Sequence, residues 1–189
     1  MEETETYDYF NALTKVMLSI DLSEVDQAVE VIRATIAEDR KIFTCGNGGS
    51  AYAASHYITD WNKMYTLAHG KRLKGISLCD NIGSITAYGN DIDYTKVFSG
   101  QLRSLGNEGD LLIIVSGSGN SPNVIDALKT AHELGIHTMA LVGYDGGICL
   151  GLAKSSVHIP TFDMQFCEDI HLMLGHIVMK KLCNQLIVE

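Results

Sequence analysis

Paired cysteines are missing from this sequence of 189 residues. Its five cysteines are odd in number and widely spaced, and no two stand in a Cys-x-x-Cys arrangement. They are Cys45, Cys79, Cys149, Cys167 and Cys183. Most lie within apolar runs, as reduced thiols in a protein core do. The pattern therefore indicates neither a disulfide framework nor a thiolate zinc site.

Basic residues are also scarce. The chain carries 14 lysines and arginines against 23 aspartates and glutamates, so its formal net charge is −9. A surface of this charge repels the phosphates of nucleic acids and of anionic lipids. We therefore expect no nucleic-acid partner and no membrane partner, and an anionic ligand would need a focused local site.

Long apolar runs, internal repeats and linker tracts are absent as well. No apolar stretch approaches the roughly 20 residues that span a bilayer, and the N-terminus lacks the basic start and apolar run of a secretory signal. We expect a cytoplasmic protein. Because 46% of the residues are hydrophobic, the chain can bury a sizeable core, and we predict a single domain over 1–189.

The sequence does contain an alternation of short apolar runs with helical patterns. Strands are predicted at 41–45, 75–79, 111–115, 138–142 and 157–159, and helices at 51–63, 83–104 and 122–134. A pair of helices within 1–40, the second capped at Ser23, precedes this core of 41–160, and a long helix over 164–187 follows it. The alternation predicts an α/β fold with a parallel five-stranded sheet and helices on both faces.

Two loops rich in glycine and serine lie between a predicted strand and a predicted helix. They are 46–50 (GNGGS) after the first strand and 116–122 (SGSGNSP) after the third. Ligands of open parallel sheets bind beyond the carboxyl ends of the strands. Glycines let the backbone approach an anion, while helix-start amides and serine hydroxyls donate to it. One such loop is as often a tight turn, but two together favour a phosphate site.

The first loop has a second interpretation. Gly46, Gly48 and Ala51 fit the Gly-x-Gly-x-x-Ala dinucleotide fingerprint, and Asp80 ends the second predicted strand. However, Asp80 follows at more than the usual twenty or so residues, and the serine-rich loop has no place in that fingerprint. We therefore place a nicotinamide enzyme well behind a phosphate-binding protein and predict no nucleotide cofactor.

Acid–base side chains lie on the helices around these loops. His56 and Asp60 are four residues apart, so both project from one helix face. On the last helix, Glu168 and His176 lie within about eighty degrees of each other, whereas His171 points away. Singly, such residues are more often core histidines or surface pairs. Their position after a phosphate-type loop favours a catalytic cluster.

Five motifs in order resemble the SIS (sugar isomerase) domain of the phosphoheptose isomerases, over nearly the whole chain. They are 45–50 (CGNGGS), 89–91 (GND), 116–124 (SGSGNSPNV), 143–147 (GYDGG) and 168–171 (EDIH) followed by His176. The resemblance implies a flavodoxin-like fold and a sugar phosphate held by the two loops with Asn90 and Asp91. It also implies a nearby divalent metal, usually zinc, and a homotetramer whose active sites lie at subunit contacts.

Two positions depart from the family pattern. The family has Glu where this chain has Asp60, and commonly Gln where it has Glu168. Aspartate keeps general-base chemistry on a shorter arm, so the substrate or metal must lie about one methylene closer. With Glu168, the cluster offers two carboxylates and two imidazoles, which suits zinc and also iron or manganese.

The first functional hypothesis is therefore a sugar-phosphate aldose–ketose isomerase, acting between sedoheptulose 7-phosphate and glycero-manno-heptose 7-phosphate as the resemblance implies. Enediol chemistry needs one group to move a proton between neighbouring carbons and another to exchange protons with the oxygens. Asp60 is the predicted base and His176 the predicted acid. The alternative is a regulatory SIS protein that binds a sugar phosphate without turnover. The family's regulatory member lacks both ionisable groups, so their presence favours the enzyme.

The remaining site predictions are given by role. Substrate contacts are assigned to Asn47, Gly48, Gly49, Ser50, Asn90, Asp91, Ser116, Gly117, Ser118, Ser121 and Glu168. Metal ligands are assigned to His56, Asp60, Glu168 and His176.

Overall fold

The strands of the computed structural model, which describes residues 4–184, form one parallel sheet in the order β2-β1-β3-β4-β5. They are β1 Lys41–Gly46, β2 Lys74–Ser77, β3 Leu111–Ser116, β4 His137–Val142 and β5 Ser155–His158. This is the flavodoxin-like order, so the predicted fold class is confirmed. The order places β1 beside β3, and hence the two loops beside each other at the centre of the sheet.

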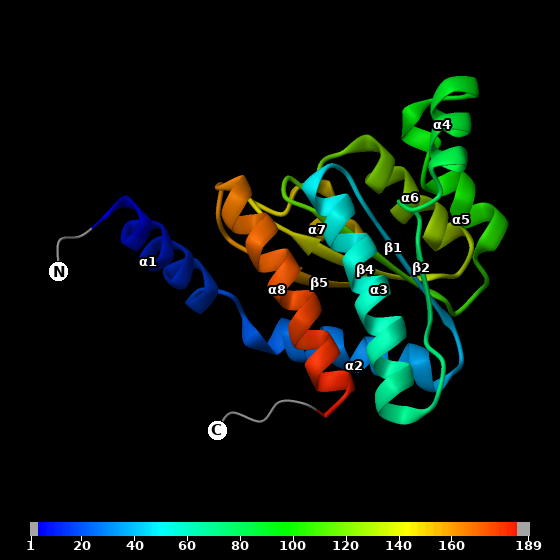
Figure 1. Ribbon diagram of the computed structural model, residues 1–189. Helices are drawn as coiled ribbons and strands as arrows, with labels where there is room; N and C mark the ends of the chain where they lie inside the picture. The colour runs from blue at the N-terminus through cyan, green and yellow to red at the C-terminus, as the bar shows by residue number, and fades with distance from the viewer. Residues whose placement is uncertain (1–3, 185–189) are drawn as a thin grey trace.

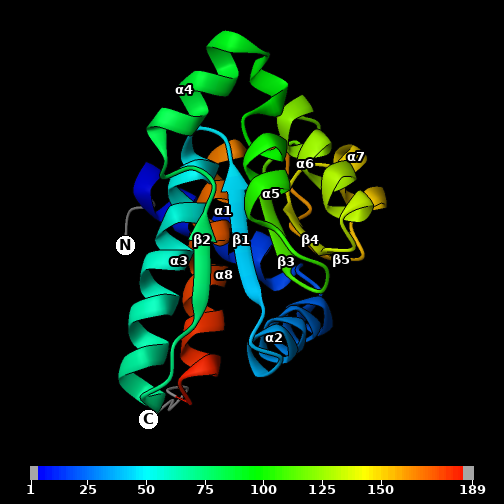
Figure 2. The ribbon, with the colours of Figure 1, turned by 90° about the vertical axis from the view of Figure 1, so that its right-hand side faces the viewer.

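Helices cover both faces of the sheet, as Figures 1 and 2 show. They are α1 Glu5–Leu18, α2 Leu22–Ala37, α3 Gly49–His69, α4 Ile82–Asp91, η1 Tyr94–Lys96, α5 Ser99–Leu105, α6 Pro122–Glu133, α7 Gly147–Leu152 and α8 Met164–Leu182. Helices α2, α3 and α8 pack on one face, and α5, α6 and α7 on the other. Among the described helices none is long and apolar enough to cross a bilayer.

The central strands are apolar throughout because each face of the sheet is buried. Successive residues of β1 alternate between the two cores: Ile42 packs with α2, α3 and α8, and Phe43 packs with α5 and α6. In β3, Ile113 and Ile114 divide in the same way. Side chains of a strand point alternately to opposite faces, so a strand buried on both faces reads as a continuous apolar run.

Helices α3 and α8 lie side by side and run in the same direction (Figure 1). The Trp61 indole N–H donates to the carbonyl of Gly175 at 2.9 Å, and the Tyr57 hydroxyl donates to the carbonyl of His171. A Cβ atom at position 175 would collide with the Tyr57 ring. Gly175 therefore permits the close approach of the two helices that carry the predicted acid–base residues.

The predicted helix 83–104 is wrong as a single element. Helix α4 ends at Asp91, and Asp93 then caps η1 by accepting a hydrogen bond from the backbone N–H of Thr95 at 2.8 Å. The chain turns there, so α4 projects from the body of the molecule (Figure 2). Asp and Asn favour such local caps over helix interiors, which is the signal that the apolar pattern concealed.

Two helix ends also differ from prediction. Helix α2 is capped by Asp21, whose carboxylate accepts from the N–H of Ser23, so Ser23 is not the cap. Helix α8 stops at Leu182, because Asn184 adopts a left-handed φ of 55° that ends helices. Residues 185–187 of the predicted helix lie outside the described residues. The short α7 was not predicted.

Candidate functional site

The two glycine- and serine-rich loops line a single pocket of about 220 Å³. The lining residues are Asn47, Gly48, Gly49, Ser50, Val115, Ser116, Gly117, Ser118, Ser121, Met164 and Glu168. The pocket therefore brings together nine of the predicted substrate contacts. It lies beyond the carboxyl ends of β1 and β3, where the strand order of the sheet switches.

Two helix starts face this pocket with free amides. Helix α3 begins after Gly48 and α6 after Ser121, and neither of these two preceding residues caps its helix with a side chain. In α6, Pro122 has no N–H and the N–H of Val124 donates to Oδ1 of Asn123, so the N–H of Asn123 is the amide that remains for a ligand. The first amides of a helix have no partner within the helix and carry its positive dipole end. Gly48 has a φ of 53°, which glycine adopts without strain. The arrangement suits a phosphate group.

The hydroxyl groups of Ser116 and Ser118, in the second loop, can still donate a hydrogen bond to a ligand. Oγ of Ser116 accepts from the N–H of Gly119 at 3.1 Å, and Oγ of Ser118 accepts from the N–H of Asn120 at 3.3 Å. A hydroxyl that accepts in this way still has its own O–H to donate. The loop thus stabilises its own turn while presenting donors to the pocket.

Glu168 forms one wall of the pocket from the second turn of α8. Its carboxylate lies so close to Gly49 that a Cβ there would collide with it. No Lys or Arg is among the described residues that line the pocket. An anion in this pocket is therefore held by neutral donors and lies near one negative side chain.

The second part of the site is the acid–base group, which we define as His56, Asp60 and His176. One ligand atom from each lies within 4.8 Å of the others, and the two histidine Nε2 atoms are 2.9 Å apart. His56 and Asp60 come from one face of α3, and His176 faces them from α8. At 2.9 Å, one imidazole donates and the other accepts.

A divalent transition metal fits the donors of this group. Two imidazoles and a carboxylate are ordinary zinc ligands, and three protein ligands leave a position open for substrate. Two nitrogens on a tetrahedral zinc lie about 3.3 Å apart, so the histidines would need to separate only slightly.

Glu168 is not part of the acid–base group, although its metal role was predicted from the shared helix face. Eight residues separate Glu168 from His176, which is about 12 Å along a helix. An angle around the helix axis says nothing of this distance along the axis. For Glu168 to complete the metal ligands, its side chain would have to leave Gly49.

Asn90 and Asp91 are not among the residues that line the pocket. Both are exposed at the end of the projecting α4, where Nδ2 of Asn90 donates to Oδ1 of Asp91 at 2.8 Å. Tyr94, three residues further on, does reach the first loop, since its hydroxyl donates to Oδ1 of Asn47 at 3.2 Å. Sequence reasoning missed this contact.

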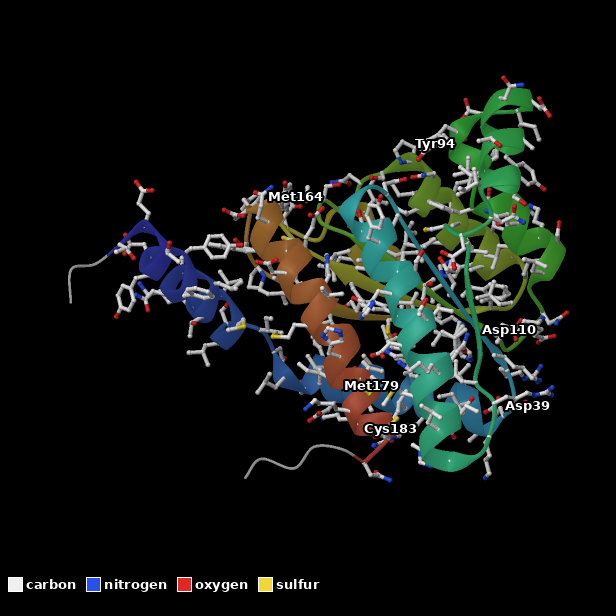
Figure 3. The ribbon with its side chains drawn as sticks, in the orientation of Figure 1. Asp39, Tyr94, Asp110, Met164, Met179 and Cys183 are labelled. Carbon is white, nitrogen blue, oxygen red and sulfur yellow. The ribbon has the colours of Figure 1, made fainter. Side chains whose placement is uncertain are left out.

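Met164 is a further pocket residue that sequence reasoning missed. Its sulfur would lie 2.7 Å from a Cβ at Gly117, so the methionine covers the glycine of the second loop. Figure 3 shows Met164 at the start of α8, where that helix meets the loops. An apolar residue at a helix start carries no chemical signal in sequence, so only the fold reveals it.

His171 lies on α8 between Glu168 and His176 but belongs to the core. It is fully buried, and neither ring nitrogen has a hydrogen-bond partner among the described residues. Burial disfavours the charged ring and lowers the pKa of His171 to about 4. This histidine is therefore neutral at physiological pH.

Known proteins resemble this chain along most of its length. The family model for the SIS domain matches residues 7–143. A phosphoheptose isomerase from Aliarcobacter butzleri is 37% identical over 162 residues, which cover 86% of this chain and 85% of that protein. The solved phosphoheptose isomerase from Neisseria gonorrhoeae shares 33% identity at a TM-score of 0.87, covering 94% of this chain and 96% of that one. A second solved structure, from Francisella tularensis, has a TM-score of 0.89 at 24% identity and covers 95% and 97% of the two chains, which shows likeness of fold.

Proposed function

Because this chain belongs to the phosphoheptose isomerase family of SIS-domain proteins, we propose that it interconverts sedoheptulose 7-phosphate and glycero-manno-heptose 7-phosphate. The observation that supports this most is the position of the acid–base group beyond an anion pocket. The pocket supplies donors for a phosphate, and the group supplies side chains that can move protons. Binding and chemistry are thus separated along the same two helices.

The length of the site agrees with a seven-carbon substrate. His56 is seven residues beyond Gly49, which is about 10.5 Å along α3, and His176 is about 12 Å beyond Glu168 along α8. An extended chain of single bonds of about 1.5 Å advances about 1.25 Å per bond, so C1 of a heptose 7-phosphate lies about 10 Å from phosphorus. A pentose phosphate would fall about 2.5 Å short by the same reckoning.

Asp60 acts in this proposal as the base that carries a proton between the two carbons of the enediol. His176 acts as the acid that exchanges protons with the sugar oxygens. His56 contacts His176 at 2.9 Å and holds that ring in place. The loops hold the phosphate through amides of Gly48 and Gly49 and through the hydroxyls of the pocket serines.

We also propose a divalent metal, with zinc as the first candidate, held by His56, Asp60 and His176. When bound, such an ion polarises a carbonyl oxygen and stabilises negative charge on it. Asp60 would then divide its two carboxylate oxygens between ligation and proton transfer.

The proposed assembly is a homotetramer with active sites at subunit contacts, in a cytoplasmic protein with one domain over 1–189. Helix α1 has no buried residue and exposes Phe10 at 63% and Leu18 at 82%, which supports a partner surface. The projecting α4 would offer Asn90 and Asp91 to a neighbouring copy. Light scattering at micromolar concentration should return four chains, and a monomer would contradict the assembly.

The activity is tested by incubating the purified protein with sedoheptulose 7-phosphate in deuterated water. We expect the aldose product to form and solvent deuterium to enter at the carbon beside the carbonyl, because a base that exchanges with solvent carries the proton. Metal content is measured on the same sample. Binding of the sugar phosphate with neither product nor exchange would favour the regulatory alternative.

A further inference from the structure

A closed pair of amide hydrogen bonds joins the two loops of the pocket. Nδ2 of Asn47 donates to Oδ1 of Asn123 at 2.8 Å, and Nδ2 of Asn123 donates back to Oδ1 of Asn47 at 2.8 Å. The backbone N–H of Val124 also donates to Oδ1 of Asn123, at 3.0 Å. Asn123 is 2% exposed, so the bridge has one buried end and one end at the pocket.

Val124 determines which way both amides face. A backbone N–H only donates, so the Asn123 atom beside it has to be the carbonyl oxygen. The amino group of Asn123 then faces Asn47, whose oxygen accepts from it. Turning either side chain over would set donor against donor and acceptor against acceptor.

Tyr94 adds a second donor to the same oxygen. Its hydroxyl donates to Oδ1 of Asn47 at 3.2 Å from η1, the segment that follows the projecting α4. Figure 3 shows Tyr94 at the end of the molecule where Met164 and the loops also lie. With two donors on its oxygen, Asn47 keeps one N–H that has no acceptor among the described residues.

We propose that Asn123 and Tyr94 are positioning residues that make Asn47 a fixed hydrogen-bond donor toward the ligand. Its partner is an acceptor oxygen of that ligand, on the phosphate or on the sugar. The proposal rests on the proposed function only for the identity of the ligand. A free asparagine side chain offers its oxygen or its nitrogen with similar ease, so holding one orientation removes an ordering cost from binding.

The experiment is a pair of double-mutant cycles read by ligand binding. Dissociation constants for inorganic phosphate and for sedoheptulose 7-phosphate are measured by calorimetry on the wild-type protein, Asn123→Ala, Tyr94→Phe, Asn47→Ala and the two double variants. Tyr88→Phe is the matched control, because the Tyr88 ring packs on Gly100 and its hydroxyl bonds to no described residue.

We expect Asn123→Ala to weaken binding about tenfold and Tyr94→Phe about two- to fivefold, as expected for an ordinary hydrogen bond and a long one. In the Asn47→Ala background neither change should weaken binding further, because the residue through which both act is gone. Tyr88→Phe should bind as the wild type does. In the turnover assay, KM should rise while kcat stays, as for uniform loss of binding.

The proposal is overturned if Asn123→Ala or Tyr94→Phe weakens binding in the Asn47→Ala background by the same factor as in the wild-type protein. It is also overturned if the wild-type protein binds neither compound. If Asn123→Ala does not fold, the Tyr94→Phe cycle decides alone, because Tyr94 is 57% exposed and its substitution leaves the core intact. Weaker binding of both compounds assigns the acceptor to the phosphate, and weaker binding of the sugar phosphate alone assigns it to a sugar oxygen. Binding without turnover would refute the proposed isomerase activity, while the binding data of both mutant cycles would still test the roles of Asn123 and Tyr94.

Discussion

The pocket and the acid–base group are built from different material. The pocket consists of backbone amides and hydroxyls on loops that the central strands hold in place, and several of its residues are buried. The acid–base group consists of three side chains on two neighbouring helices, and His56 in it is exposed. The first region depends on backbone conformation, and the second depends on side-chain identity.

This difference separates what the fold supplies from what single residues supply. A pocket of amides persists when side chains around it change, because every residue except proline brings an N–H. An acid–base group is lost with one substitution. A SIS protein can therefore lose turnover and keep its ligand, which is the pattern that the regulatory alternative describes. The predictions below test whether the two regions can be changed independently of each other and of the core.

The largest effect is expected from Asp60→Asn. The change keeps the shape of the side chain and removes its basicity, so kcat should fall about a hundred- to ten-thousandfold while phosphate affinity stays near that of the wild type. Steady-state kinetics and calorimetry measure the two quantities, and metal content is determined beside them because a ligand is also weakened. If Asp60→Asn and His176→Ala both leave turnover and metal content unchanged, the assignment of this group is wrong.

His171 is a buried structural histidine on the same helix as the acid–base residue His176. Its pKa is about 4 in the folded protein and about 6.5 when unfolded. The unfolded chain therefore binds the proton first as pH falls, so stability is full above pH 6.5 and declines toward pH 4, by about 3 kcal/mol.

Replacing this ring should flatten that decline. In His171→Leu, the free energy of unfolding from urea titrations should depend less on pH between 6.5 and 4 than in the wild type, and kcat should be nearly retained at neutral pH. An unchanged pH dependence would show that His171 does not titrate as its burial implies.

The Ser118→Ala variant perturbs the pocket alone. One hydroxyl donor to a charged group contributes roughly 1.5–3 kcal/mol, so affinity for the sugar phosphate should fall about ten- to a hundredfold. At saturating substrate, kcat should stay within about threefold, since the acid–base group is untouched. A large fall in kcat with unchanged affinity would mean that the two regions are not separate.

The smallest effect is expected from Glu168→Gln. The carboxylate lies in an anion pocket to which residues 4–184 contribute no basic side chain, so neutralising it should tighten inorganic phosphate binding about three- to tenfold at low salt. The gain should shrink as salt screens the repulsion. Weaker binding in the variant, measured by calorimetry at two salt concentrations, would show instead that the carboxylate assists the ligand.

Much of the pocket was predictable because its signal is local. In the glycine and serine runs 46–50 and 116–122, a few neighbouring residues are enough to predict both the turn and the hydrogen-bond donors. The parallel sheet then brings the two runs together. The contact of Glu168 with Gly49 was not predictable from a helical face, because it depends on how α3 and α8 align through contacts such as those of Tyr57 and Trp61 with α8. The Asn47–Asn123 bridge spans 76 residues and leaves no pattern in sequence.

The pairing of α3 with α8 also divides the chain into a part that forms the loops and a part that completes the site. His56 and His176 are 120 positions apart, and α8 is the last element that the structure describes. The strands and helices that carry the two glycine-rich loops all lie within residues 41–133, whereas Met164, Glu168 and His176 all come from α8. Catalytic competence therefore requires that the C-terminal helix has docked on α3, and the same docking supplies the pocket wall that Met164 and Glu168 form.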